Sequence, residues 1–139
     1  MKQITQFLFE SLAKPKNKEE LRKLIENMVK NKHFKELNNI DVSHITDMSK
    51  LFCGLDIGDI NISDWDVSHV EDMSGMFMGC ERFNSNLNYW NVSNVKYMDS
   101  MFNGCKNFNC DISNWDVRHV RSMNNAFKNC ETQPDWYKK

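Results

Sequence analysis

The chain has 139 residues, of which 40% are apolar and 27% are charged. This length and this apolar content suffice for one folded domain and argue against a disordered chain. The formal net charge of -1 at pH 7 is unevenly distributed. Residues 1–36 hold nine Lys/Arg and five Asp/Glu (+4), whereas residues 37–139 hold nine Lys/Arg and fourteen Asp/Glu (-5). A basic N-terminal part therefore precedes an acidic body.

Residues 2–13 predict an amphipathic helix that Pro15 interrupts. Its apolar positions are Ile4, Phe7, Leu8 and Leu12. Gln6 and Glu10 break the apolar run, which is too short for a signal sequence or a membrane span. The sequence therefore predicts a cytoplasmic protein that does not bind membranes.

A second helix is predicted to follow, because Asn17 is a favoured N-cap residue and Glu20 lies three positions further on. Its apolar stripe consists of Leu21, Leu24, Ile25, Met28 and Val29. Repeat arrays need their terminal faces covered. We therefore expect residues 1–36 to form a two-helix cap.

The body of the chain, residues 37–130, is a tandem repeat with a period of 25 residues. The segments that begin at Ile62, Leu87 and Ile112 align without a gap, and a diverged copy begins near Ile40. The positions that share this register are Trp65, Trp90 and Trp115; Val42, Val67, Val92 and Val117; Met48, Met73, Met98 and Met123; Phe52, Phe77, Phe102 and Phe127; and Cys80, Cys105 and Cys130. The chain therefore holds about three and a half coils of a repeat protein.

Each repeat predicts one short helix and one short strand. The helix is indicated by apolar residues at helical spacing, namely Val70, Met73, Met76, Phe77 and Cys80. Ser68 and Glu71 match a capping box, and Gly79 lies where the helix is expected to end. The segments 83–87 and 112–117 are typical of short parallel strands. We expect equivalent side chains of successive coils to stack in a common core.

The string Trp-Asp-Val-Ser-x-Val-x-x-Met-x-x-Met-Phe-x-Gly-Cys-x-x-Phe-Asn resembles the repeat of the BspA-like leucine-rich-repeat family, which includes tandem repeats of mycoplasma lipoproteins. The resemblance covers most of the chain. It implies an α/β fold, a leucine-rich-repeat-type solenoid, without a catalytic centre. Such repeats are often found in bacterial surface proteins that adhere to host proteins.

The repeat register ends after Cys130, and residues 131–139 form a C-terminal tail. Gln133 falls in the register of Phe83 and Phe108, so the tail cannot continue the core. Two arrangements remain open: Trp136 and its neighbour fold back as a lid, or they protrude. An incomplete lid leaves an edge that could pair with another molecule, including a second copy of the chain.

A metal site is suggested by His44, His69 and His119, which share one register beside the cysteine series. The histidine positions are expected to be exposed and the cysteine positions buried, so we predict no metal. The five cysteines are expected to be reduced thiols. Another column, Asp41, Asp66, Asn91 and Asp116, is expected to accept hydrogen bonds from the adjoining turn. No nucleophile–base pair or phosphate-binding loop is present, so neither an enzyme nor a cofactor is predicted.

Exposed positions that vary between repeats are candidates for recognition. Tyr89 and Tyr97 interrupt columns of small polar residues, and tyrosine is a common anchor in protein interfaces. Lys96, Arg118 and Arg121 vary nearby and could set a charge preference. We therefore predict a module that binds another protein through these five residues, with ordinary solvated surface as the alternative for each one.

Two further interpretations stay open. The stretch Met1-Lys2 followed by Phe7-x-x-Glu10-Ser11-Leu12 resembles the leader of many proteins of large tailed phages. This resemblance implies a phage-encoded protein of the host cytoplasm or of the virion. Such a protein could inhibit a host nuclease or defence protein by imitating nucleic acid with its acidic body, or it could be a structural component of the virion. Nucleic acid itself is not an expected partner.

Overall fold

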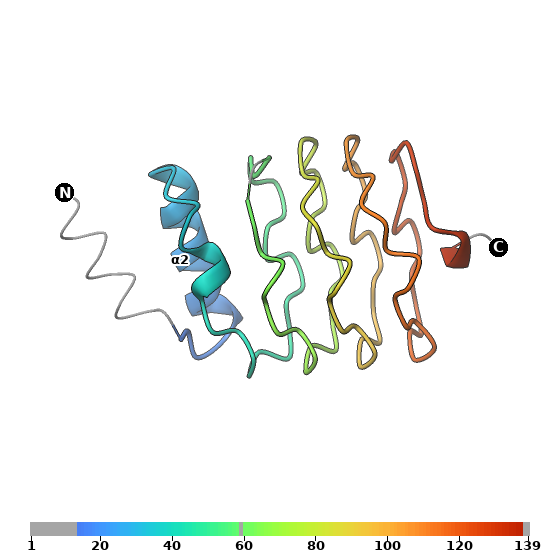
Figure 1. Ribbon diagram of the computed structural model, residues 1–139, viewed down its shortest axis with the longest axis horizontal. Helices are drawn as coiled ribbons and strands as arrows, with labels where there is room; N and C mark the ends of the chain where they lie inside the picture. Colours follow the sequence, from blue (N-terminus) through green and yellow to red (C-terminus); the bar gives the residue numbers. More distant parts are fainter. Residues whose placement is uncertain (1–13, 59, 138–139) are drawn as a thin grey trace.

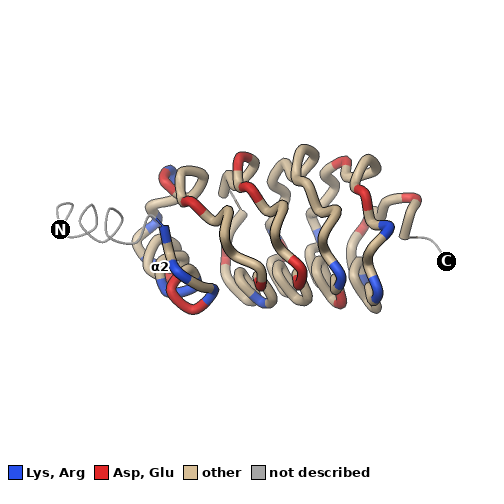
Figure 2. The backbone as a smooth tube through the Cα atoms, turned by 90° about the horizontal axis from the view of Figure 1, so that it is seen from below, with Lys and Arg blue, Asp and Glu red and all other residues tan. Residues whose placement is uncertain are grey.

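The computed structural model describes residues 14–58 and 60–137. Helix α2 (Lys18–Lys30) and the short 3₁₀ helix η1 (Leu37–Asn39) lie at one end, and the 3₁₀ helix η2 (Asp135–Tyr137) lies at the other. Between them the chain winds through irregular coils that stack side by side (Figures 1 and 2). Following the repeat register, we number them coil 1 (37–61), coil 2 (62–86), coil 3 (87–111) and coil 4 (112–136).

Helix α2 begins as the sequence predicts. The side chain of Asn17 accepts a hydrogen bond from the Glu20 N–H at 3.0 Å, and Glu20 accepts one in return from the Lys16 N–H. Its buried residues are Leu21, Leu24, Ile25 and Met28, which belong to the same core as the coils. The helix predicted for residues 2–13 lies outside the described residues. Within the described chain, no helix is long and apolar enough to cross a membrane.

The helix predicted for each repeat is wrong. Residues 73–76 and 77–80 instead form two consecutive turns, each closed by a hydrogen bond from its fourth N–H to its first carbonyl, at 3.2 and 3.0 Å. The third residues of these turns, Gly75 and Gly79, have φ angles of 63° and 79°. Such angles belong to the left-handed region, which a right-handed helix cannot contain.

The turns reproduce the apolar spacing of a helix. The first and fourth residues of both turns are buried, namely Met73, Met76, Phe77 and Cys80. Two consecutive four-residue turns therefore place apolar side chains at i, i+3, i+4 and i+7, which is also the spacing of one helical face. The pattern was correctly identified as a buried stripe, but it does not distinguish the two backbone conformations.

Successive coils are joined by backbone hydrogen bonds from alternate residues of the turn segment. In coil 1 the donors are Met48, Lys50, Phe52 and Gly54, and the acceptors in coil 2 are the carbonyls of Asp72, Ser74, Met76 and Met78, at 2.8–3.0 Å. The intervening N–H groups close the turns within each coil. Parallel pairing is limited to isolated bridges that connect Asp47, Asp72, Tyr97 and Ser122 in succession.

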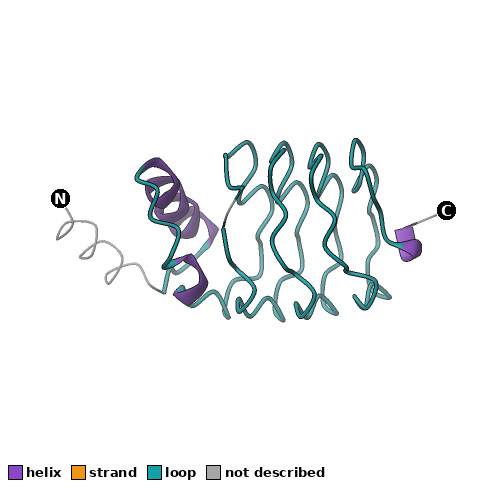
Figure 3. Cartoon of the chain, turned by 45° about the horizontal axis from the view of Figure 1, so that its top comes forward, coloured by secondary structure: helices purple, strands orange, loops and turns teal. Residues whose placement is uncertain are grey.

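The predicted strands are also wrong, and the described residues contain no sheet (Figure 3). In segment 83–87 and its equivalents, the N–H groups form no backbone ladder with a neighbouring strand. The Phe83 N–H closes a turn on the Cys80 carbonyl at 3.1 Å, the Leu87 N–H donates to Cys110 Sγ at 3.3 Å, and the Asn109 N–H donates to Asn84 Oδ1 at 2.8 Å. The α/β class with a helix and a strand in each coil is therefore incorrect. The fold is a stack of coils built from turns.

Equivalent aromatic side chains stack through the core. Rings of the Phe column, Phe52, Phe77, Phe102 and Phe127, lie 5.2–5.5 Å apart between centroids in adjacent coils. The indole N–H groups of Trp65, Trp90 and Trp115 donate to the carbonyls of Leu37, Ile62 and Leu87 in the preceding coil, at 2.8–3.0 Å. Each tryptophan therefore contributes both apolar burial and a hydrogen bond that joins two coils.

The C-terminal tail folds back, which decides between the two arrangements left open by the sequence. The Trp136 indole stacks on Trp115 with centroids 6.3 Å apart, and its N–H donates to the Ile112 carbonyl at 2.9 Å. Tyr137 packs edge-on against Phe127 with centroids 4.9 Å apart. Trp136 thus occupies the place of the next tryptophan in the column although it lies outside the 25-residue register.

The left-handed turn positions give matched stability predictions. Ser100 has a φ of 57°, and Gly104, four residues later, has a φ of 84°. Ser100→Gly is expected to raise the free energy of unfolding by about 0.5–1 kcal/mol, since glycine adopts this conformation without a side-chain clash. Gly104→Ala is expected to lower it by about 1–2 kcal/mol. Urea denaturation measures both, and effects of the same sign at the two sites would contradict the turn geometry.

Candidate protein-binding face

Metal binding finds no support in the geometry. No group of three or more His, Cys, Asp or Glu side chains is placed to hold an ion within residues 14–58 and 60–137. The histidine column is exposed, and its members have different partners: His119 Nδ1 donates to the Ser93 carbonyl of the preceding coil at 3.0 Å, His44 bonds to the Pro15 carbonyl, and His69 bonds to the adjacent Ser68 hydroxyl. Asn94, which interrupts the column, donates to the Ser68 carbonyl at 2.7 Å. His119 and Asn94 therefore both join neighbouring coils from this position.

The cysteine column packs in the core. All five cysteines are free thiols, and Cys80 and Cys105 are buried. Their thiols donate to the carbonyls of Phe52 and Phe77, each at 3.0 Å. Burial raises the pKa of Cys80 to about 12 and raises the pKa of Cys105 as well. Neither thiol is therefore available as a nucleophile or a metal ligand at neutral pH.

Alkylation tests the burial of these thiols. In the folded protein at pH 8, iodoacetamide is expected to leave Cys80 and Cys105 unmodified, whereas in urea all five cysteines react. An unfolded thiol ionises near pH 9.0, but folded Cys80 stays protonated up to about pH 12. The stability from its burial is therefore complete below pH 9 and is lost as the pH rises toward 12. Mass spectrometry of the labelled chain measures the first effect, and rapid native labelling of Cys80 would contradict it.

The acidic column stabilises turns. The Asp66 carboxylate accepts hydrogen bonds from the Ser68 hydroxyl and N–H, and these bonds lower its pKa. Asn91 accepts the equivalent bonds from Ser93, so a charge is not required at this position. In coil 4 the partner is Arg118, whose side-chain hydrogen bonds lower the pKa of Asp116 to about 2. The predicted hydrogen-bonding role is confirmed, although no helix follows the turn.

Four of the five predicted contact residues lie along neighbouring columns of coils 3 and 4. Lys96 and Arg121 occupy equivalent positions, and the Arg121 N–H donates to the Lys96 carbonyl at 2.7 Å. Tyr97 forms the adjacent bridge to Ser122. Arg118 lies three residues before Arg121, on the turn that leads to the bridge. We call Lys96, Tyr97, Arg118 and Arg121 the basic–aromatic face.

Tyr97 is 38% exposed and replaces an aspartate that supports the backbone in earlier coils. There Asp47 and Asp72 each accept a hydrogen bond from an N–H two residues later, at 2.9 Å. Tyrosine cannot supply this acceptor. In coil 4, where Ser122 holds this position, the acceptor comes from coil 3: the Asp99 carboxylate accepts hydrogen bonds from the Ser122 hydroxyl and from the Asn124 N–H. Asp99 therefore supports the turn of coil 4, and Tyr97 has no such role in coil 3.

The charges of the face differ in how they are paired. Lys96 Nζ lies 3.2 Å from Glu71 Oε1, and Arg118 makes two bonds of 2.9 Å to Asp116. Among the described residues, Arg121 has no ion-pair partner, and its residue is exposed. Of the three predicted basic residues, Arg121 is therefore the one whose charge is available without breaking a pair.

Tyr89 is separate from this face. It is 84% exposed and lies on the turn of residues 87–90, beside a shallow groove lined by polar residues such as Asn86 and Asp111. None of the other four predicted residues lines this groove. The structure therefore groups four of the five predicted residues and leaves Tyr89 on another part of the coil.

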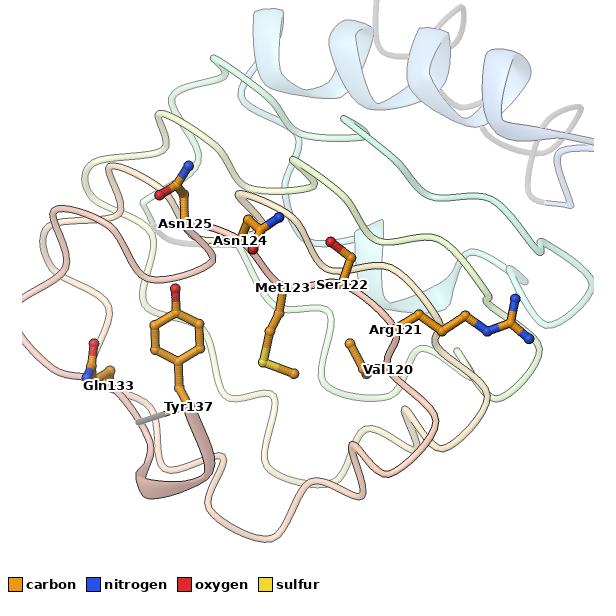
Figure 4. Close-up of a pocket in the computed structure, with 8 residues that line it drawn as sticks. All are labelled: Val120, Arg121, Ser122, Met123, Asn124, Asn125, Gln133 and Tyr137. Carbon is orange, nitrogen blue, oxygen red and sulfur yellow. The ribbon is translucent and has the colours of Figure 1, made fainter. Parts of the chain in front are cut away.

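A second groove, of about 920 Å³, lies at the C-terminal face of coil 4 (Figure 4). It is lined by Val120, Arg121, Ser122, Met123, Asn124, Asn125, Gln133 and Tyr137. Asp99 and this groove were not among the predicted site residues. The aligned repeats show Asp99 where earlier copies have serine, whereas the groove depends on how the tail folds back.

A family model described as "Mycoplasma protein of unknown function, DUF285" matches residues 19–137. This match begins within α2 and extends through the four coils to the end of η2. No curated protein and no solved structure matches the chain.

Proposed function

The chain belongs to the DUF285 family of mycoplasma proteins, and we propose that it is a non-catalytic module that binds another protein through the basic–aromatic face. The observation that carries this proposal is the exposed tyrosine at position 97. The framework positions of the repeat are buried and constant, whereas Tyr97 places an aromatic side chain where coils 1 and 2 have aspartates that support their turns. Tyrosine and arginine are both enriched at protein interfaces.

The arrangement of charge supports a protein partner over imitation of nucleic acid. A nucleic-acid mimic requires acidic side chains gathered on one side. In Figure 2, Asp/Glu positions predominate along the upper edge of the coils, whereas Lys/Arg and Asp/Glu positions are mixed along the lower edge. Six of the acidic positions in the coils also have a basic partner within 4 Å, namely Asp41, Asp47, Asp56, Glu71, Glu81 and Asp116. No specific observation favours the nuclease-inhibitor or virion interpretation, and we propose neither.

Affinity capture of partners, followed by binding measurements with a variant of the face and a matched control variant, tests this function. The tagged protein is used to capture partners from mycoplasma lysate, followed by binding measurements with the purified partner. Tyr97→Ala is expected to weaken that binding about tenfold or more, since interface tyrosines are frequent hot spots. The melting temperature should change little, because the side chain is partly exposed.

Asn107→Ala is the matched control, because Asn107 is exposed in coil 3 and is not part of the basic–aromatic face. This variant should bind the partner as the unaltered protein does. Equal loss of binding in both variants would place the contact elsewhere. Failure of the unaltered protein to retain any stoichiometric partner would reject the proposed function.

A further inference from the structure

The C-terminal face of coil 4 carries a row of backbone donors. In coil 3, the N–H groups of Met98, Ser100, Phe102 and Gly104 donate to the carbonyls of Ser122, Asn124, Ala126 and Lys128 at 2.8–2.9 Å. The equivalent N–H groups in coil 4 belong to Met123, Asn125, Phe127 and Asn129, and they have no acceptor within residues 14–58 and 60–137. The last coil therefore leaves incomplete the hydrogen-bonding pattern that joins the other coils.

The tail covers only part of this end. Trp136 and Tyr137 pack on the aromatic core at Trp115 and Phe127. In Figure 4, Met123 and Asn125 lie along the groove, and Tyr137 borders it from the side of the tail. Asn125 and Asn129 are exposed. Phe127 is buried against Trp136 and Tyr137, so an extended chain can approach the donor row along the groove at Met123 and Asn125.

Charge at the same edge indicates what such a chain should carry. Glu71 and Lys96 occupy equivalent positions of coils 2 and 3 and form an ion pair at 3.2 Å. Arg121 holds the next position of this column and has no ion-pair partner in the described part of the chain. An acidic side chain in the following position would face Arg121 in the way that Glu71 faces Lys96.

A second copy of the chain fits this edge poorly. Two such edges placed face to face would oppose N–H donors with N–H donors. The complementary carbonyls at the other end, on coil 1, are covered by α2, whose Arg22 donates to the carbonyls of Leu51 and Cys53 at 2.9 and 3.3 Å. Head-to-tail association would therefore require α2 to leave its place.

We infer that the C-terminal edge of coil 4 binds an extended segment of a partner polypeptide, whose carbonyls accept hydrogen bonds from the donor row and whose acidic side chain pairs with Arg121. The segment adds to the stack as another coil would, which is the backbone-pairing mode of β-strand addition. This inference rests on the proposed function, because Arg121 belongs to both the edge and the basic–aromatic face.

A peptide taken from the repeat provides the probe. Residues 69–80 contain the carbonyls of Asp72, Ser74, Met76 and Met78, which accept from the equivalent row in coil 1, and Glu71, which supplies the acidic side chain. The peptide is made with Cys80→Ser and titrated into the ¹⁵N-labelled full chain. The amide signals of Met123, Asn125, Phe127 and Asn129 are expected to shift, while those of Met98 and Ser100 stay in place.

Charge reversal makes the test specific. A peptide with Glu71→Lys is expected to bind about two- to fivefold more weakly, the range of an exposed ion pair. In the Arg121→Glu protein the preference should invert, so that the lysine peptide binds more tightly than the glutamate peptide. Absence of shifts in the donor row, equal shifts with a scrambled peptide, or an unchanged preference in the Arg121→Glu protein would each overturn the inference.

Self-association is tested in parallel by sedimentation velocity, where a monomer is expected. A reversible dimer whose interface amides are those of the donor row would overturn the assignment to a partner polypeptide. The Tyr97→Ala result does not depend on the donor row. If peptide binding fails while Tyr97→Ala still releases a partner, the edge inference is wrong and the proposed function stands. If the peptide binds the edge but Tyr97→Ala does not weaken partner binding, the basic–aromatic face is rejected instead.

Discussion

Trp90→Ala is expected to lower the free energy of unfolding by about 3–5 kcal/mol, the largest effect of any single substitution proposed for this protein. Trp90 lies in the middle of the tryptophan column and is 4% exposed. Its ring packs against Phe77 with centroids 6.3 Å apart, and its indole N–H donates to the Ile62 carbonyl at 3.0 Å. The alanine variant loses this burial and leaves a cavity between coils 2 and 3. Urea denaturation followed by circular dichroism measures the loss.

The neighbouring residue offers a control. Tyr89 precedes Trp90 in the chain but is 84% exposed, so Tyr89→Ala should change the free energy of unfolding by no more than about 0.5 kcal/mol. Trp90→Phe keeps an aromatic ring but removes the N–H, and an intermediate loss is expected. If Trp90→Ala costs less than about 1 kcal/mol, the column does not stabilise the stack and the packing described above is wrong.

The sequence predicted the side-chain columns better than it predicted the backbone. A constant 25-residue register implies that each coil repeats the same path, and equivalent residues such as Phe52 and Phe77 then stack on one another. The path itself depends on residues with left-handed φ at two positions of each coil, which are Lys50, Gly75, Ser100 and Asn125 at the first and Gly54, Gly79, Gly104 and Asn129 at the second. Only one of the first four is glycine, so the signal there is weak. The glycines at the second position also match the end of a helix. The helical spacing was therefore the stronger pattern and led to the wrong α/β class.

The candidate face was predictable in part for a similar reason. Comparing the repeats with one another identifies Tyr97 as an exception and also shows Asp99 in place of serine. It cannot show that Lys96 and Arg118 are paired with acidic neighbours, because those contacts depend on side-chain conformation. The donor row of coil 4 could not be predicted from the sequence either. The sequence shows that the register ends after Cys130 and leaves open whether the tail forms a lid, but which N–H groups remain without acceptors depends on the turn geometry.

The other end of the stack shows how an open edge is closed within this chain. In coil 2 the carbonyls of Met76 and Met78 accept N–H groups from coil 1, at 2.8 and 3.0 Å. Leu51 and Cys53 are the equivalent residues of coil 1, where no coil precedes. The Arg22 guanidinium on α2 donates to both carbonyls, and it also reaches the Lys50 carbonyl at 3.1 Å. A single side chain therefore replaces donors that a preceding coil would supply.

Arg22→Met is expected to lower the free energy of unfolding by about 1.5–3 kcal/mol, the range for hydrogen bonds that involve a charged group. Methionine retains much of the apolar stem but provides no donor, so the coil 1 carbonyls lose these bonds. Arg22 also pairs with Glu26 at 2.9 Å, and Glu26→Gln isolates that contribution, which should stay within about 0.5 kcal/mol because Glu26 is exposed. Urea denaturation compares the variants, with Lys23→Met as the surface control on the same helix. Equal stability of Arg22→Met and Lys23→Met would show that α2 covers coil 1 by apolar packing alone.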